Sequence, residues 1–378
     1  MVRAVAALAL AVSLVGGVGP HAAGAGCQVW GTSQPLSPGT SENELNAVTV
    51  PSPCVAWAVG RYATVGGEKT LVERWDGTSW TVVPSPSPGS VFDKLDGVVA
   101  VSASKAWAVG SFDDGSGERT LVLRWTGTAW KRQKTPSPGP TVNTLTAVTA
   151  TSASDVWAVG WYERGGFDRT LTLHFNGTSW KHVQSPTFGT YGNTLNGVSA
   201  VSSHDVWAVG DRSTAGSPNT LVVHWNGVSW SRVKSPNFGP ADNDLNAVAA
   251  LSSSDVWVVG DHINSAGLYD ATLVLRWNGS RWKRFKSQNP GGASSNNFLT
   301  GVAVTSRTNA WAVGVYGSPS QNLIIHWDGK AWRRVMPPDL GGPATTHILN
   351  GVAASSSTNA WAVGDESSPP RTVAFHCC

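Results

Sequence analysis

Charged residues are scarce in this sequence. Asp, Glu, Lys and Arg make up 13% of its 378 residues, about half of the roughly 25% found in an ordinary soluble domain. The formal net charge is only +3, and no cluster of Lys and Arg stands out. Because the basic surface of a nucleic-acid-binding protein is missing, we expect no nucleic-acid partner.

Long apolar runs are scarce as well, and the one that occurs lies at the N-terminus. A positive charge at Arg3 precedes an apolar run over residues 4–18, and the small residues Ala23 and Ala25 follow. This run is shorter than the ~20 residues of a membrane-spanning helix, and the pattern is that of a secretory signal peptide. We therefore predict a signal peptide over residues 1–26, export of the rest of the chain and no membrane span.

Cysteine is rare and confined to the two ends of the chain, at Cys27, Cys54, Cys377 and Cys378. These positions lack the paired spacing of a zinc site, and we expect no metal. An even number of cysteines in an exported chain predicts disulfide bonds. Cys27 has an alternative role as a lipidated first residue, although the Leu that usually precedes such a cysteine by three positions is absent.

Tryptophan and glycine are abundant, with 20 and 42 residues, and this composition excludes a disordered chain, a coiled coil and a typical helical enzyme. The tryptophans mark a unit of about 50 residues that occurs seven times. Its copies begin at Leu45, Leu95, Leu145, Leu195, Leu245, Leu299 and Leu349. All tryptophans except Trp161 recur at three fixed positions of the unit. Internal repeats of this length are typical of β-propellers.

Each unit contains four short runs of β-branched and aromatic residues separated by turn signals, which is the pattern of strands. We name these strands A to D. Strand B reads V-W-A-V-G, an Asn-Gly or Asp-Gly dipeptide typical of a tight hairpin separates C from D, and Ser-Pro ends strand D. Four antiparallel strands repeated seven times predict an all-β fold, a seven-bladed β-propeller over residues 27–378.

The seventh unit ends after strand C, and its strand D is found at the other end of the chain. Residues 27–30 match residues 77–80, and Trp30 precedes Leu45 by the same 15 positions as Trp80 precedes Leu95. We therefore predict that residues 27–44 complete the last blade, which closes the ring and removes free sheet edges.

This closure brings the cysteines of the two ends together. We expect Cys27 to form a disulfide with Cys377 or Cys378, which would stabilise the ring by closing a very long loop. Cys54 lies in the A–B turn of the first unit, next to the split blade, and we expect it to bond to the remaining terminal cysteine.

The repeat resembles the kelch motif, with an apolar strand ending in Gly, an aromatic strand, a Trp after a turn and a Ser-Pro exit. Kelch units carry a Gly-Gly pair where this chain has one Gly, as at Gly60 and Gly110. The repeat is more similar to the Trp-rich propeller repeats of secreted bacterial proteins. That resemblance implies a fold without a fixed activity or cofactor.

Strand direction divides the connections between two faces of the ring. The A–B and C–D turns are short and nearly identical, whereas the B–C and D–A loops, on the other face, vary in length and sequence. Variable loops on a rigid scaffold carry function, so we predict the binding face on the B–C/D–A side. Two positions directly after the Gly of strand B change type between units, and from them we select the candidate ligand-binding residues Arg61, Tyr62, Trp161, Tyr162, Asp211, Asp261, His262, Tyr316 and Asp365.

Three further patterns have a functional and a structural interpretation. The aromatic residues around Trp161 predict a platform for a sugar ring or a partner side chain, or alternatively a cover over strand ends. An Arg or His before the strand C aromatic suggests a ring of ligands, but we interpret it as cation–π packing between blades. Residues 113–118 could bind calcium, but they lack the spacing of a known loop and are better explained as a solvated turn.

The sequence therefore predicts a secreted, monomeric binding scaffold that recognises a glycan or a protein partner, with no cofactor and no catalytic residue assigned. The alternative is a propeller enzyme acting on polysaccharide, a glycosidase or a lyase. Such an enzyme needs converging carboxylates or a Tyr/His/Arg cluster, and no acidic pair stands out from the repeat. A third possibility is a purely structural surface component.

Overall fold

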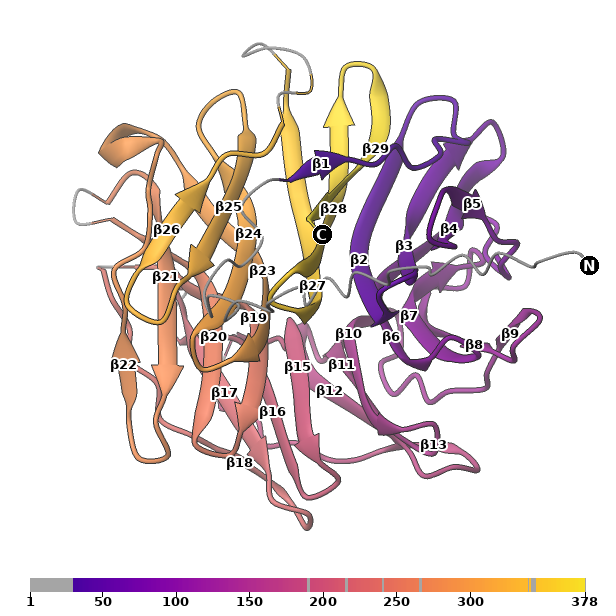
Figure 1. Ribbon diagram of the computed structural model, residues 1–378. Helices are drawn as coiled ribbons and strands as arrows, with labels where there is room; N and C mark the ends of the chain where they lie inside the picture. Colours follow the sequence, from indigo (N-terminus) through magenta and orange to yellow (C-terminus); the bar gives the residue numbers. More distant parts are fainter. Residues whose placement is uncertain are drawn as a thin grey trace, which may run out of the picture.

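Seven antiparallel sheets stand around a central axis in the computed structural model of the chain (Figure 1). The structure describes residues 30–377 apart from 189–190, 215–216, 240, 265–266, 339 and 341–344. The predicted signal peptide, residues 1–26, lies outside the described residues, as do Cys27 and Cys378. No helix in the described part of the chain is long and apolar enough to cross a bilayer.

Blades 1 to 6 each follow the order A–B–C–D along the chain. Blade 1 contains β2 (Asn43–Ser52), β3 (Val55–Thr64), β4 (Gly67–Trp75) and β5 (Trp80–Val82), and blade 2 contains β6 (Phe92–Ser102), β7 (Lys105–Asp113), β8 (Glu118–Trp125) and β9 (Trp130–Arg132). Blade 3 contains β10 (Asn143–Ser152), β11 (Asp155–Arg164), β12 (Phe167–Phe175) and β13 (Trp180–His182). Blade 4 has a divided strand A, β14 (Gly192–Asn193) and β15 (Gly197–Ser202), then β16 (Asp205–Thr214), β17 (Ser217–Trp225) and β18 (Trp230–Arg232).

The remaining blades have the same order. Blade 5 contains β19 (Asn243–Ser252), β20 (Asp255–Ile263), β21 (Asp270–Trp277) and β22 (Trp282–Arg284), and blade 6 contains β23 (Asn297–Ser306), β24 (Asn309–Tyr316), β25 (Gln321–Trp327) and β26 (Trp332–Val335). A 3-10 turn, η1 (Gly292–Ser294), precedes blade 6, and blade 7 contains β27 (His347–Ser356), β28 (Asn359–Ser367), β29 (Pro370–Cys377) and β1 (Gly31–Thr32). The seven-bladed all-β fold predicted from the repeat is confirmed.

The C–D hairpins form where the Asn-Gly and Asp-Gly pairs predicted them. In blade 1, Gly77 has a φ of +105°, a conformation that a residue with a Cβ rarely adopts. The side chain of Asp76 accepts hydrogen bonds from the backbone amides of Thr78 and Ser79 at 2.9 and 3.0 Å. These bonds hold the turn closed, so strand D returns along strand C in a fixed register.

The hydrophobic core lies between the blades. The strand B tryptophan of one blade packs against the aromatic residues of strands C and D in the next, as Trp57 does with Trp125 at 4.9 Å and Trp130 at 5.3 Å between ring centroids. Each such indole removes about 150–250 Å² from water. One blade alone cannot bury these rings, because each is covered by its neighbour, and the stack is complete only when the ring closes.

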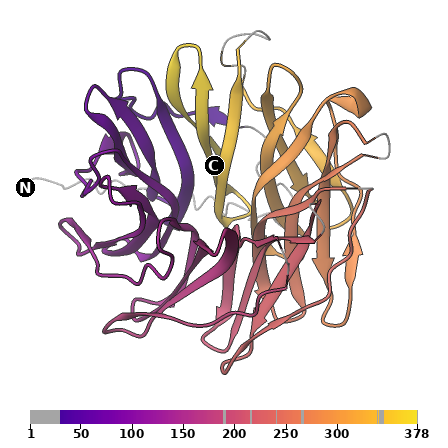
Figure 2. The same cartoon turned by 180° about the vertical axis from the view of Figure 1, so that it is seen from behind.

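The N-terminal strand closes the ring as predicted. β1 lies beside β29 in both views (Figures 1 and 2), with Gly31 opposite His376 and Thr32 opposite Phe375. The amide of Ser33 donates to the carbonyl of Ala374 at 2.9 Å. Trp30 is only 3% exposed and meets Trp311 edge-on, with 5.2 Å between ring centroids. Blade 7 is therefore built from both ends of the chain.

The cysteine predictions are corrected at one position. Cys54 is a free, exposed cysteine, so the expectation that it bonds to a terminal cysteine is wrong. The reason is local: the A–B turn that holds Cys54 packs on the C–D turn of its own blade, where a Cβ on Gly77 would lie 3.4 Å from the Cβ of Cys54. Cys377 is buried and disulfide-bonded. That its partner is Cys27 stays a prediction, because Cys27 lies outside the described residues.

Candidate functional site

The strands A line a channel along the axis of the ring, with a volume of about 230 Å³. Each blade contributes three consecutive residues to its wall: 46–48, 96–98, 146–148, 196–198, 246–248, 300–302 and 350–352. A bulge between Leu45 and Ala47 interrupts the pairing of β2 with β3. Six blades carry such an irregularity at this point of strand A, and in the remaining one, blade 4, strand A is broken here. The bulge turns the residue after each leading Leu towards the channel.

These residues form a hydrogen-bonded belt around the channel. Asn46 donates to the carbonyl of Leu95 at 3.0 Å, and Asn350 donates to the carbonyl of Leu45 at 3.1 Å, so each side chain ties its blade to the next. Asp96 interrupts this pattern in blade 2, and burial raises the pKa of its carboxyl. Its carboxyl instead accepts from Asn46 at 3.3 Å and lies 3.4 Å from the ammonium of Lys94.

The first position after the strand B Gly lies at one end of this channel, on the B–C/D–A side. Asp261 accepts from Asn246 at 2.9 Å and Asp365 accepts from Asn350 at 3.0 Å, and both asparagines line the channel. We name the seven first positions, together with the strand A residues directly opposite them, the channel mouth. Its pairs are Glu44/Arg61, Lys94/Ser111, Thr144/Trp161, Thr194/Asp211, Asp244/Asp261, Phe298/Val315 and Ile348/Asp365. Five of the predicted site residues, Arg61, Trp161, Asp211, Asp261 and Asp365, are therefore at the mouth.

Three carboxylates gather on the blade 4 and blade 5 side of the mouth, and we name Asp211, Asp244 and Asp261 the acidic sector. Asp244 on β19 is directly opposite Asp261 on β20. Burial raises the pKa of Asp261 to about 8 and that of Asp244 to about 7, and repulsion from neighbouring carboxylates, including Asp242 and Asp270, adds to both. Within the described ranges, none of the three forms an ion pair with a Lys or Arg.

On the opposite side of the mouth, the carboxylate of Glu44 is paired with Arg61. The guanidinium of Arg61 donates to both carboxylate oxygens of Glu44 at 2.8 and 2.9 Å and to Glu68 at 2.9 Å. These bonds raise the pKa of Arg61 above its usual range. The guanidinium of Arg61 is thus occupied by ion pairs within its own blade. Burial, and then the nearby Glu44, raises the pKa of Asp365 to about 6. Among the described residues of the mouth, the carboxyl groups without an ion pair are therefore Asp211, Asp244 and Asp261 in blades 4 and 5, and Asp365 in blade 7.

The second position after the strand B Gly faces away from the mouth and packs on strand D of the same blade. Tyr162 meets His182 edge-on at 5.9 Å. Nε2 of His262 lies 2.7 Å from a guanidinium nitrogen of Arg284. This ring nitrogen is the acceptor, because a guanidinium group can only donate. Arg334 lies 4.5 Å from the ring centroid of Tyr316 and donates to its hydroxyl at 2.5 Å.

These contacts separate the predicted aromatic residues. Consecutive residues of a strand point to opposite faces, so Trp161 lies at the mouth while Tyr162 packs within its blade. Tyr62, the equivalent residue of blade 1, is partly buried against the core. The tyrosines thus cover strand ends, and of the predicted platform only Trp161 lies at the mouth.

The Arg/His positions of strand C are packing residues, as interpreted from the sequence. Arg124 lies 4.9 Å from the ring centroid of Trp107, and His376 stacks on Trp361 at 4.0 Å. The contact is mainly within one blade rather than between blades, because the two positions are directly opposite on strands B and C. Burial lowers the pKa of His326 and His376, which favours neutral imidazole rings at physiological pH.

Residues 113–118 form a tight turn, as expected. The carboxylate of Asp113 accepts from the amide of Gly115 at 2.7 Å, and that of Asp114 accepts from the amide of Ser116 at 3.0 Å. In the part of the chain that the structure describes, no group of three or more His, Cys, Asp or Glu side chains is arranged to hold a metal ion.

Sequence reasoning missed the acidic pair. Asp244 and Asp261 are 17 positions apart in the sequence. Other units also carry polar or charged residues at these two positions, so neither residue stands out from the repeat. The signal was present in the antiparallel register: the residue before the leading Leu faces the residue after the strand B Gly in every blade. Reading those two positions as pairs would have placed Asp244 against Asp261.

No protein-family model matches the sequence, and no curated protein matches it. Solved structures do resemble this fold. A structure of YCF48 bound to D1 peptide has a TM-score of 0.57 and 12% identity, with 92% of this chain and 94% of that chain covered. YCF48 from Cyanidioschyzon merolae has a TM-score of 0.53 and 16% identity, with 92% and 98% covered.

A GH74 xyloglucanase from Xanthomonas campestris has a TM-score of 0.59 and 15% identity. The match covers 88% of this chain and 53% of the xyloglucanase, so this chain spans about half of its length. Identities this low establish the fold alone. The roles of these proteins differ, which is expected because function depends on the site and not on the fold. The chain is a seven-bladed β-propeller with Trp-rich strands.

Proposed function

We propose that this protein is an exported binding protein whose channel mouth receives a positively charged segment of a protein partner. The observation that carries the proposal is the acidic sector. Its three carboxylates sit on strands of a rigid ring, at the face where the repeat varies, and no Lys or Arg of the described residues forms an ion pair with them.

The electrostatics of the sector favour a cation. Two carboxylates held opposite each other repel, and partial burial removes the water that would screen them. A Lys or Arg side chain placed between them offsets both effects, and it forms charge-assisted hydrogen bonds, which are stronger than neutral ones. A neutral sugar supplies no such compensation. A protein segment therefore fits this mouth better than a neutral glycan.

Two other observations support a protein partner. The aromatic side chains that a sugar ring would stack on are largely used in packing, since Tyr162 and Tyr316 are covered by strand D. A similar propeller, YCF48, has been solved with a peptide bound. Trp161 stays available at the mouth, where it can pack on the aliphatic part of a Lys or Arg side chain.

The test is binding of a fluorescently labelled decapeptide rich in Lys and Arg, measured by polarisation at constant ionic strength near 0.15 M. The double variant D244N/D261N should weaken binding by tenfold or more. The control is D328N, because Asp328 lies on the opposite face in a C–D turn, where it pairs with Arg333 at 2.8 Å. Equal binding by the wild type and D244N/D261N would refute the proposal.

A glycan array on the same protein separates the two ligand classes. Binding of a neutral glycan that is lost in Trp161→Ala, while the cationic peptide does not bind, would favour sugar recognition instead. The folded state of each variant is checked by circular dichroism and by its unfolding midpoint, so that loss of binding is not confused with loss of structure.

The acidic pair also favours a second candidate, a polysaccharide-cleaving enzyme. A carboxyl group with a pKa near neutrality can act as a general acid while its neighbour stays ionised, and Asp244 and Asp261 have pKa values of about 7 and 8. Release of reducing ends from xyloglucan or pectin, abolished in D261N, would establish this activity. Absence of any turnover leaves the binding role.

A further inference from the structure

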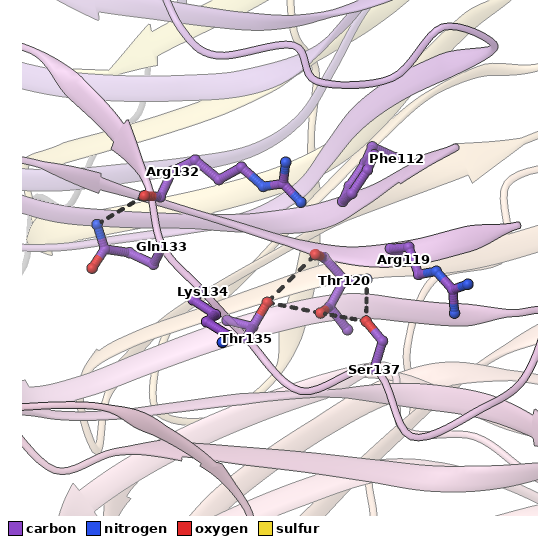
Figure 3. A pocket seen from close by; sticks show the side chains of 8 residues that line it. All are labelled: Phe112, Arg119, Thr120, Arg132, Gln133, Lys134, Thr135 and Ser137. Carbon is purple, nitrogen blue, oxygen red and sulfur yellow. Dashed lines mark hydrogen bonds between the residues drawn. The ribbon is translucent and has the colours of Figure 1, made fainter. Parts of the chain in front are cut away.

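A basic pocket lies at the outer edge of blade 2, away from the channel mouth but on the same B–C/D–A side. Its volume is about 430 Å³. Strands β7, β8 and β9 and the connection after β9 supply its lining: Phe112, Arg119, Thr120, Arg132, Gln133, Lys134, Thr135 and Ser137 (Figure 3). Three of these eight side chains are cationic and none is acidic. A cavity of this size is in the range that binds small ligands.

The floor of the pocket is rigid. The hydroxyl of Thr120 lies 2.8 Å from that of Thr135 and 3.1 Å from that of Ser137, and the amide of Thr120 donates to Ser137 at 3.2 Å (Figure 3). The Thr at the equivalent position of other blades also bonds to the segment that follows strand D, as Thr70 does with Ser85 at 2.7 Å between hydroxyl oxygens. The cations of blade 2 are therefore displayed on a repeated, ordered frame.

Arg132 differs from its counterparts in how its donors are used. Figure 3 shows its side chain extending towards the ring of Phe112, and the guanidinium lies 4.3 Å from the ring centroid. At the same position, Arg284 donates to His262 and Arg334 donates to the hydroxyl of Tyr316. Phe112 offers no acceptor, so stacking fixes the plane of the Arg132 guanidinium without consuming its N–H groups.

Arg119 differs in the same way. Its counterpart in blade 1, Lys69, pairs with Asp93 at 3.4 Å, the acidic residue that begins strand A of the next blade. In blade 3 this residue is the neutral Asn143, so Arg119 has no such partner. Among the described residues, the side chain of Arg119 forms one hydrogen bond, a long contact of 3.4 Å to the carbonyl of Ser116.

The nearest carboxylates do not neutralise the pocket. Asp93 is fully buried and accepts hydrogen bonds from Lys69 and from the amide of Gly89. The charge of Arg132 acts on it only as a minor electrostatic contribution. Asp114 is near Arg119 but bonds to the amide and hydroxyl of Ser116 in the B–C turn. Neither lines the cavity.

We infer that this pocket binds an oxyanion, the carboxylate, sulfate or phosphate group of a ligand. Arg side chains recognise such groups through two parallel N–H···O bonds. Arg132 has a fixed plane for this geometry, Arg119 supplies a second fork, and Lys134 adds a third positive charge at the rim. The channel mouth and this pocket thus select opposite charges, so one partner could be held at both.

Isothermal titration calorimetry at constant ionic strength tests the inference, with trigalacturonate, inorganic sulfate and inorganic phosphate as separate probes and maltotriose as the neutral control. At least one anion should bind saturably with a 1:1 stoichiometry, and R119Q/R132Q should weaken it by tenfold or more. The probe that binds best identifies the oxyanion class. The matched control is R232Q, because Arg232 is the blade 4 counterpart of Arg132 and stacks on Phe188 at 5.6 Å.

Three outcomes would overturn the inference: no anion binds the wild type, R119Q/R132Q binds as the wild type does, or R232Q weakens binding equally. The third would indicate a general response to positive charge. The unfolding midpoint of R119Q/R132Q should stay within a few degrees of the wild type, because Arg132 is exposed, Arg119 is half-buried and neither forms an ion pair with a described residue. D244N/D261N should bind the anion normally, which separates this site from the channel mouth.

Discussion

Removing the indole of Trp30 should detach the N-terminal strand from blade 7. Trp30 is 3% exposed, and burying a Trp removes about 150–250 Å² from water, which corresponds to ~4–6 kcal/mol at about 25 cal/mol per Å². A Trp→Ala change inside a core costs about 3–5 kcal/mol. β1 is the outer strand of blade 7. The loss in Trp30→Ala cannot exceed the free energy that docks this strand, so Trp30→Ala should cost no more than the same change at an equivalent Trp within the ring.

The matched control is Trp130→Ala. Trp130 holds the equivalent position in blade 2, is 4% exposed and meets Trp57 edge-on at 5.3 Å, but its strand is held at both ends. Urea denaturation, with the cysteines reduced so that no disulfide retains the strand, should show a loss of about 3–5 kcal/mol for Trp130→Ala and an equal or smaller loss for Trp30→Ala.

Hydrogen exchange distinguishes the two variants. The amide of Ser33 donates to Ala374 across the closing strand, so it should exchange freely in Trp30→Ala and stay protected in Trp130→Ala. Two results would contradict this prediction: a Ser33 amide that stays protected in Trp30→Ala with a stability loss below about 1 kcal/mol, or a Ser33 amide that becomes exposed in Trp130→Ala as well.

Four further outcomes are expected. Asp261→Asn should stabilise the protein by about 1–3 kcal/mol at pH 9 and little at pH 4. The carboxyl of Asp261 has a raised pKa in the folded state, so it lowers the stability of the wild type as the pH rises from the unfolded pKa near 4 to about 8. A gain in urea denaturation that does not depend on pH would contradict this. Glu73→Leu should stabilise at pH 8 and not at pH 4, since burial raises the pKa of Glu73 to about 7 at a position where other blades are apolar. A loss at pH 8 would mean that its 2.9 Å bond from the Leu36 amide dominates. Phe175→Trp should raise the melting temperature, because the larger ring fills part of a pocket of about 430 Å³ beside it; a lower melting temperature would indicate overpacking. Cys54 should react with a maleimide in the native protein, as mass spectrometry will show, because it is exposed and free; a native protein that stays unlabelled would contradict this.

Blade number, strand order and ring closure were readable from the sequence because each depends on local pattern and period. The Trp lattice marks every strand B and strand D, Asn-Gly and Asp-Gly mark the hairpins, and the displaced strand D at Trp30 identifies the blade that is split. One blade cannot bury its tryptophans without a neighbour, so the repeat itself requires a stack. The position of Trp161 off the lattice likewise marked it as a residue that the core does not need.

The site depended on information that no single segment holds. Whether a side chain reaches the channel mouth or packs on strand D follows from strand alternation and from the bulge in strand A. The charge of the mouth depends on which residue faces which across β19 and β20, where Asp244 meets Asp261. The basic pocket depends on neighbours as well, since Arg132 keeps its donors only because Phe112 offers no acceptor. The sequence alone determined the architecture, because a repeated local pattern specifies each blade, whereas contacts between distant strands decided where charge is left unpaired.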